Sequence, residues 1–277
     1  MRKYIFCALL TAFLATPFIA KGLNLNFGSS AFSISNSEVT VNYNNPESFT
    51  TYKEEFSVDL PCNILEINWV EGKVKIETDA KAEKITISEK TNKPASEDLC
   101  MQYRVADNAI SLCYAKAGKH NLDGLTKELY IKLPQNTEFQ EVHMTSSSAD
   151  IDAKFNKTKV LKLFNVSGDL DFEINSANSI EASNTSGETD IEARKADTVV
   201  INEVSGETEL EFAQAPGSID VQSSSGNVEV KLPLGTTVNT KTNTLSGTVT
   251  NDFSQKDMAE CKININSVSG SIKIKTR

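Results

Sequence analysis

Residues 161–174 read LKLFNVSGDLDFEI and residues 180–193 read IEASNTSGETDIEA. In both stretches apolar side chains occupy alternate positions on either side of a Ser-Gly step. A period of two is typical of a β-strand, in which successive side chains point to opposite faces. We therefore predict two short strands meeting at a corner, where glycine tolerates a positive φ and serine bonds local backbone groups.

The same step recurs throughout the C-terminal half. The spacings between successive steps are 19, 19, 19, 20, 21 and 23 residues, counted from a related Ser148-Ala149 step. Repeats of this length are typical of solenoids. We predict an all-β fold, a single-stranded β-solenoid of about seven repeats preceded by a smaller β-strand region. The steps are Ser167-Gly168, Ser186-Gly187, Ser205-Gly206, Ser225-Gly226, Ser246-Gly247 and Ser269-Gly270.

Alignment on the glycines places apolar side chains in columns. The column five residues before the glycine holds Met144, Leu163, Ala182, Ile201, Val221, Thr242 and Ile265. The column four residues after it holds Ala153, Phe172, Ile191, Leu210, Val230, Asn251 and Ile274. A meander of hairpins satisfies the same alternation, but it needs a layer to cover its apolar face, and no amphipathic helix is visible in the sequence. A coil covers that face with itself, which favours the solenoid.

Four segments follow from these patterns. Residues 1–20 form the first, with Arg2 and Lys3 before an apolar run that is typical of a secretory signal peptide. An uncleaved anchor is the alternative. Residues 21–54 are expected to be a flexible or strand-rich lead-in, 55–140 an N-terminal β region and 141–277 the solenoid repeats. An exported protein is periplasmic, exposed at the cell surface or secreted.

The charge of the chain excludes one class of partner. The net charge is −9, and removal of residues 1–20 takes away two basic and no acidic residues, giving −11. Binding of nucleic-acid phosphates needs clustered Lys and Arg, so no nucleic-acid partner is expected. Contact with a membrane is expected only through an uncleaved N-terminal segment. The remaining partner classes are an envelope protein or a glycan.

Four cysteines follow the apolar leader: Cys62, Cys100, Cys113 and Cys261. Residues 99–105 and 109–114 flank Asp107-Asn108 and are typical of a hairpin. Such a hairpin brings Cys100 and Cys113 near each other, and an exported protein permits a disulfide between them. Free buried thiols are the alternative.

Acidic residues recur one, three and five positions after the corner. In a stacked coil the twelve carboxylates would share one face. One column holds Asp152, Asp171, Asp190 and Glu209, which suggests a weak site for Ca²⁺, since carboxylate oxygens are its preferred ligands. A solvated face that aids solubility and a surface for a basic partner are the alternatives. The full set is Asp150, Asp152, Asp169, Asp171, Glu173, Glu188, Asp190, Glu192, Glu207, Glu209, Glu211 and Glu229.

The sequence contains no recognisable catalytic or phosphate-binding motif and suggests no cofactor. A solenoid lyase or hydrolase acting on carbohydrate is the enzymatic alternative, with paired surface carboxylates as its catalytic groups. The acidic column repeats over many coils instead of marking one unique place. We therefore expect a non-catalytic protein. The last strand, 271–275, has no visible cap and is expected to form an open end of the stack.

The order of these features resembles the putative-adhesin family of exported bacterial proteins, a family of unknown function, and is also similar to autotransporter adhesin head domains. The resemblance rests on Leu65-Glu66-Ile67, Gly72 to Ile76, Val105 to Leu112, Leu129 to Pro134 and the Ser-Gly repeats. It covers roughly residues 55–277. The resemblance implies a β-solenoid at the cell envelope that serves as an adhesin-like binding or structural module, and it implies no established chemistry.

Overall fold

The computed structural model describes residues 31–35 and 38–277. The proposed signal segment lies outside these residues. Two 3₁₀ turns, η1 (Pro46–Ser48) and η2 (Glu97–Leu99), accompany the strands. No helix within the described residues has the length and hydropathy needed to cross a membrane. The strands are β1 (Ala31–Ser35), β2 (Glu38–Asn42), β3 (Thr50–Thr51), β4 (Phe56–Val58), β5 (Ile64–Asp79), β6 (Ile85–Thr91), β7 (Gln102–Ala106), β8 (Ala109–Cys113), β9 (Gly118–Asn121), β10 (Lys127–Pro134), β11 (Glu138–Ser167), β12 (Leu170–Ser186), β13 (Thr189–Ser205), β14 (Thr208–Phe212), β15 (Ser218–Ser225), β16 (Val228–Leu232), β17 (Val238–Ser246), β18 (Val249–Asn251), β19 (Cys261–Ser269) and β20 (Ile272–Thr276).

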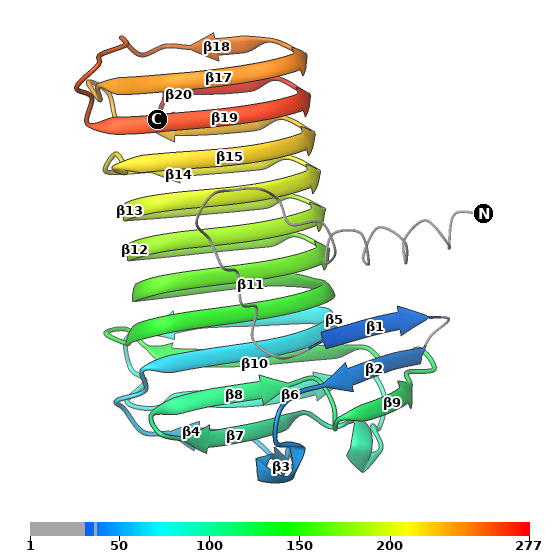
Figure 1. Cartoon of the computed structure of the whole chain (residues 1–277). Helices are drawn as coiled ribbons and strands as arrows, with labels where there is room; N and C mark the ends of the chain where they lie inside the picture. Colours follow the sequence, from blue (N-terminus) through cyan, green and yellow to red (C-terminus); the bar gives the residue numbers. More distant parts are fainter. Residues whose placement is uncertain (1–30, 36–37) are drawn as a thin grey trace.

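The chain is a solenoid-like stack of parallel strands (Figure 1). Strands β11 and β12 pair in parallel, with Leu161 opposite Ile180 and Ala153 opposite Phe172. The same relation holds between β12 and β13. Pairing is therefore between like positions of successive coils, and the hairpin alternative is excluded because it would require antiparallel neighbours.

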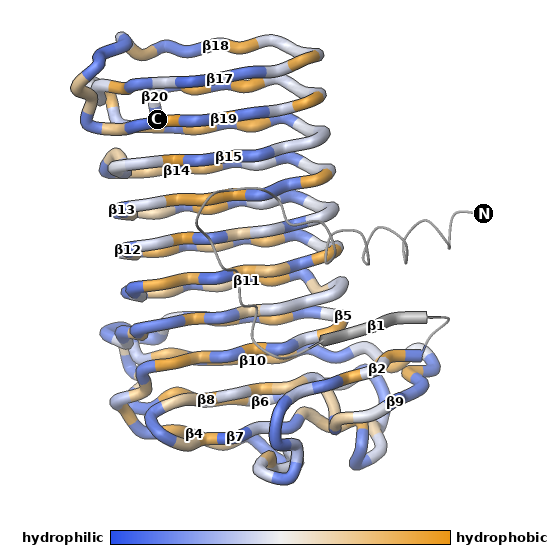
Figure 2. Tube along the Cα trace, in the orientation of Figure 1, coloured by the Kyte–Doolittle hydropathy of each residue, from blue (hydrophilic) through white to orange (hydrophobic). Residues whose placement is uncertain are grey.

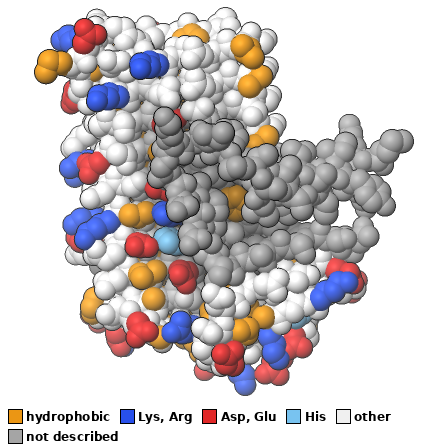
Figure 3. Space-filling model, viewed as in Figure 1, with side chains coloured by type: hydrophobic (Ala, Val, Ile, Leu, Met, Phe, Trp, Pro, Cys, Tyr) orange, Lys and Arg blue, Asp and Glu red, His pale blue; other side chains and the backbone are white. Residues whose placement is uncertain are grey.

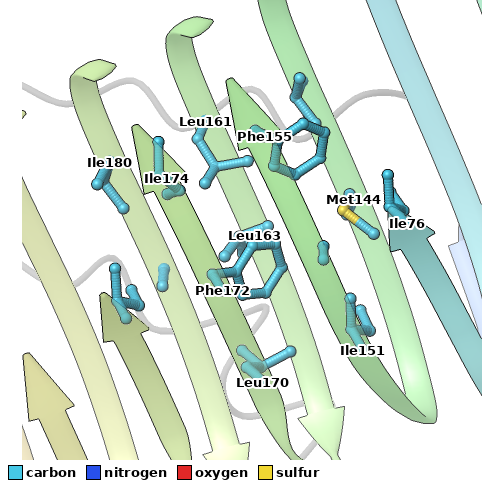
Figure 4. Packing of buried hydrophobic residues seen from close by; sticks show 14 of the residues in the cluster. Ile76, Met144, Ile151, Phe155, Leu161, Leu163, Leu170, Phe172, Ile174 and Ile180 are labelled. Atoms are coloured by element: carbon cyan, nitrogen blue, oxygen red, sulfur yellow. The ribbon is translucent and has the colours of Figure 1, made fainter. Parts of the chain in front are cut away.

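The core lies between the two layers of each coil. Hydrophobic and hydrophilic positions alternate along the strands of the central coils (Figure 2). Phe172, Ile191 and Leu210 lie in register on neighbouring strands and are fully buried. Figure 4 shows Phe172 between the strands with Leu163 and Phe155 beside it. Burial of each such side chain stabilises the fold by about 1.5–3 kcal/mol, so the apolar columns hold the coil closed.

The corners require glycine because neighbouring coils approach each other closely. Gly187 has φ +122°, and a Cβ added there would lie 2.3 Å from the carbonyl oxygen of Gly168. An ordinary carbon–oxygen contact is about 1 Å longer. Ala149, the one corner without glycine, pairs with Gly72 of β5 inside a continuous strand and is not among the residues with positive φ. This explains why alanine is accepted at that corner.

The order of the last coils differs from the order along the chain. Strand β19 pairs with β15 on one side and with β17 on the other, and β20 lies between β16 and β18. The C-terminal coil is thus inserted between the two coils that precede it in sequence. Our expectation that residues 271–275 form an open end was wrong. Strands β17 and β18 form that end of the stack (Figure 1).

The composition of the end coil explains this order. The inward positions of β17 and β18 include Thr240, Thr242 and Asn251, which are half-buried. Strands β19 and β20 place isoleucines at the same positions, and these are fully buried. Apolar side chains are stabilised more by full burial in the centre of the stack, whereas Thr and Asn can remain in contact with water at its end. The Gln255 side chain accepts a hydrogen bond from the Thr240 N–H at 2.9 Å and so covers part of the open edge.

The N-terminal half continues the same sheet. Strand β5 pairs in parallel with β11, with Leu65 opposite Val142. It also pairs with β10, which in turn pairs antiparallel with β6. Strands β4 and β7 add antiparallel pairs at the far end, and β1, β2 and β9 form a separate three-stranded sheet. One 17-stranded sheet therefore runs through both halves of the chain.

Candidate functional site

The acidic residues lie in register on the strands that follow the corners. Asp152 is opposite Asp171, Asp171 opposite Asp190, and Asp190 opposite Glu209. The column continues to Glu229. It is bounded at its ends by Lys75, opposite Asp152, and Lys273, opposite Glu229. Five carboxylates thus follow one another along the stack, at the usual strand spacing of about 4.8 Å.

The neighbouring column is largely neutralised. Lys154 forms an ion pair with Glu173 at 2.5 Å, and Arg277 pairs with Glu192 at 3.1 Å and also with Glu211. Lys231 forms ion pairs with Glu209 and Glu211. It therefore links this network to Glu209 of the column that runs from Asp152 to Glu229. Sequence reasoning did not foresee the role of Arg277, which reaches coils 85 positions earlier in the chain.

Within the described residues Asp152, Asp171 and Asp190 form no ion pair, although Lys154 lies near enough to Asp171, and Lys231 near enough to Asp190, to oppose the rise in their pKa values. Partial burial, with Asp152 and Glu173 nearby, raises the pKa of Asp171. Partial burial, with Glu209 and Asp171 nearby, raises the pKa of Asp190 to about 6. Both shifts have the sign expected when carboxylates crowd together, because crowding disfavours the charged form.

The predicted Ca²⁺ site receives no support from this geometry. Among the described residues no three His, Cys, Asp or Glu side chains converge in a way that could hold a metal ion. Asp152, Asp171, Asp190 and Glu209 stand side by side on parallel strands, so their carboxylates line a surface. A cation that needs six or more oxygens around one point finds them only with many water molecules.

The disulfide predicted between Cys100 and Cys113 is not present in the structure. Cys62, Cys100, Cys113 and Cys261 are all free thiols. The register of the hairpin explains the separation: Gln102, and not Cys100, lies opposite Cys113. The Cys100 thiol donates to the Ser96 carbonyl at 3.4 Å, while Cys113 is buried and burial raises its pKa to about 12.

A second polar column, inside the stack, was not foreseen. It lies three residues before each corner glycine and contains Asn165, Asn184, Glu203 and Ser223, in register on successive coils. All four are buried. Burial raises the pKa of Glu203 to about 8, although Thr189 donates a hydrogen bond to its Oε2 at 3.2 Å. The recurrence of Asn, Asn, Glu and Ser at this position was the sequence signal.

The N-terminal half contains a buried ion pair. Lys127 Nζ lies 2.5 Å from Glu89 Oε1, and both side chains are almost inaccessible. The ammonium also donates to the Leu99 carbonyl at 2.7 Å and lies 5.1 Å from the Trp69 ring centroid. Burial lowers the pKa of Lys127, and Glu89 opposes that shift. The pair packs against Trp69 inside the N-terminal half. Its contacts are with other buried groups of the protein, so we assign it a structural role.

Comparisons with solved structures find proteins of low identity. A putative cell adhesion protein from Clostridium sporogenes is 16% identical, covers 82% of this chain and 100% of its own, and has a TM-score of 0.38. A putative adhesin from Bacteroides fragilis is 13% identical, with coverage of 82% and 99% and a TM-score of 0.41. A putative lipid binding protein from Parabacteroides distasonis is 13% identical, with coverage of 82% and 98% and a TM-score of 0.34.

No curated protein matches the sequence. The predicted similarity to autotransporter head domains stays a prediction. The family comparison is more extensive, because the model of the Toastrack domain of unknown function, DUF4097, matches residues 29–277. These residues include the whole stack of coils and the antiparallel strands at its N-terminal end. The chain therefore belongs to the Toastrack DUF4097 family.

Proposed function

We propose that this chain is an exported, non-catalytic binding module of the adhesin type at the bacterial cell envelope, and that it engages a basic protein or a cationic glycan. The observation that carries the proposal is the pair Asp171 and Asp190 in the middle of the carboxylate column, which lie in register and form no ion pair with a described residue. Glu173, Glu192, Glu209 and Glu211 on the same face are each paired with lysine or arginine.

The energetics favour a cationic partner at this pair. Two like charges about 4.8 Å apart repel by about 0.9 kcal/mol even at the dielectric constant of water. Burial raises the pKa values of Asp171 and Asp190, and this repulsion adds to the rise. An ammonium or guanidinium group placed between the two carboxylates removes the repulsion and gains attraction, so binding relieves a cost that the free protein carries.

The repetition of the column favours an extended partner. Carboxylates recur at every coil from Asp152 to Glu229 on a backbone that is hydrogen-bonded from coil to coil. A linear polymer with repeated positive charges makes several weak contacts at once, and the effective concentration after the first contact raises the overall affinity. A rigid stack also loses little conformational entropy on binding.

The test measures binding of fluorescently labelled poly-L-lysine by anisotropy at increasing NaCl concentration. We expect the double variant Asp171→Asn/Asp190→Asn to bind at least fivefold more weakly than the wild type. The control variant Asp107→Asn/Asp123→Asn removes the same charge from side chains that are 94% and 90% exposed in the N-terminal half.

Equal weakening by the two double variants would show that net charge alone drives binding and would contradict the proposal. Release of reducing ends or unsaturated products from acidic or neutral glycans would contradict its non-catalytic part.

A further inference from the structure

The outer face of the strands that precede the corners carries a column of carboxamide side chains. The column lies four residues before the corner glycine and holds Asn202, Gln222, Asn266 and Asn243, opposite one another on four successive coils. On the first three of these coils the preceding residue is a fully buried Ile or Val, so the alternation of the strand directs the carboxamides outward. Figure 3 views this side of the stack, and uncharged surface predominates over the described part of its upper coils. At a strand spacing of about 4.8 Å the column is about 14 Å long.

A chain of hydrogen bonds holds these side chains in place. Asn243 Nδ2 donates to Asn266 Oδ1 at 2.9 Å, and Asn266 Nδ2 donates to Asn264 Oδ1 at 3.3 Å. Asn264 Nδ2 and Gln222 Nε2 donate to the two oxygens of Asp220 at 2.9 and 2.8 Å. Side chains that are ordered before a ligand arrives lose little conformational entropy when it binds. The column is therefore preorganised for hydrogen bonding.

These carboxamides keep donors and acceptors for a ligand. A carboxamide has two N–H donors and one oxygen with two lone pairs. Asn266 donates once and accepts once within the chain of hydrogen bonds, which leaves it one N–H and one lone pair. The side-chain oxygens of Asn243 and Gln222 accept no hydrogen bond from any described residue. The column thus presents donors and acceptors at intervals of about 4.8 Å.

The column carries no charge, unlike the acidic face on the other layer of the coil. Its four members are neutral, and Asp220 beside them has both oxygens occupied by amide N–H groups. Lys241, opposite Asn264 on the outermost coil, has the opposite charge to Asp220. A strongly charged polymer therefore gains little attraction here, and the complementary ligand is a neutral one rich in hydroxyl or amide groups.

Exposed apolar side chains border the column on the corner side. Val268 and Leu245 lie two residues beyond Asn266 and Asn243 on the same face and are 54% and 85% exposed. A sugar ring presents hydroxyl groups at its rim and C–H groups on its faces, so it can contact both columns at once. The core of a protein–protein interface is enriched in aromatic side chains and arginine, and neither occurs among these six residues.

We propose that this carboxamide face binds a neutral, linear polysaccharide. Its ring hydroxyls bond to the column of four carboxamides, and its C–H faces pack on Val268 and Leu245. A column about 14 Å long extends beyond a single sugar ring, so several consecutive sugars are bound. The site lies on the opposite layer from the carboxylate column and does not depend on the partner of that column.

The test is isothermal titration calorimetry of the whole chain with three neutral β-1,4-linked sugars: cellohexaose, mannohexaose and fully N-acetylated chitohexaose. We expect at least one to bind, with an affinity that changes less than twofold when the NaCl concentration is raised, because no charge is neutralised. Gln222→Ala/Asn243→Ala should weaken that binding at least tenfold. Leu245→Ser, at a side chain that packs little against the fold, should weaken it at least threefold. Urea unfolding of each variant verifies that it is folded.

The control is Asp171→Asn/Asp190→Asn, which should bind the sugar as the wild type does while its binding of poly-L-lysine is weakened. This inference and the proposed function therefore fail independently. The inference is overturned if none of the three sugars binds the wild type, or if folded Gln222→Ala/Asn243→Ala binds as tightly as the wild type. It is also overturned if light scattering shows a dimer that Leu245→Ser abolishes, because the face would then be a contact between copies of the chain.

Discussion

A methyl group added at a corner tests the close approach of the coils directly. In Gly187→Ala the new Cβ would lie 2.3 Å from the Gly168 carbonyl oxygen and 2.8 Å from its carbon, both in the backbone of the neighbouring coil. Backbone atoms cannot rotate away as the end of a side chain can. The two coils must therefore separate locally, which breaks hydrogen bonds between their strands.

The expected cost has two parts. A non-glycine residue in this region of φ costs about 1–3 kcal/mol. Forcing an extra methyl group into a packed site costs about 1–3 kcal/mol more. We expect Gly187→Ala to lower the free energy of unfolding by the sum of the two, about 2–6 kcal/mol. Gly124 provides a matched control, since it has φ +74° and a Cβ there meets nothing within 4 Å. Gly124→Ala should cost only the backbone part, about 1–3 kcal/mol.

Urea unfolding followed by circular dichroism measures both variants, with the m-value used to confirm that the same structure unfolds. If Gly187→Ala cost no more than Gly124→Ala, the corners would not be held in close contact, and our explanation of the repeated glycine would be refuted.

Three further predictions follow from buried and surface charges and from the order of the coils. Lys127→Met should lower the free energy of unfolding, measured in guanidinium chloride, by about 3–5 kcal/mol, because it leaves the Glu89 carboxylate buried and unpaired. An unchanged free energy of unfolding would contradict the close pairing of Lys127 with Glu89. Thr240→Val combined with Thr242→Ile should make the open end of the stack apolar and increase the mass measured by light scattering with rising concentration. Lys273→Ile, on a strand enclosed between two others, should not have that effect. The folded protein raises the pKa of Asp190 to about 6. The protein is therefore most stable with respect to this group below the ordinary pKa of an aspartate, and it loses that stability as the pH rises through about 6. Asp190→Asn should therefore stabilise the protein by about 1 kcal/mol in urea at pH 7.5, after screening by solvent, and have no effect at pH 4.

The sequence by itself determined the repeating unit, the inward columns and the register of the acidic face. Alternation around Ser-Gly assigns Phe172, Ile191 and Leu210 to the interior, and a nearly constant period places Asp171 beside Asp190. Those inferences hold because side-chain direction in a strand depends only on parity, and because a constant repeat length keeps like positions opposite each other.

Only the tertiary structure decided which coils are neighbours and which polar groups share the interior. The last coil lies between the two coils that precede it in sequence. Burial there stabilises its isoleucines more than it would stabilise Thr240, Thr242 and Asn251 of the coil at the end of the stack. The contact of Arg277 with Glu192 depends on that insertion. Glu203 was missed because an acidic residue in a strand is ordinarily assigned to solvent, and its burial becomes apparent only when the opposite layer places Thr189 beside it. Contacts between layers depend on how the whole coil closes, which no local pattern encodes.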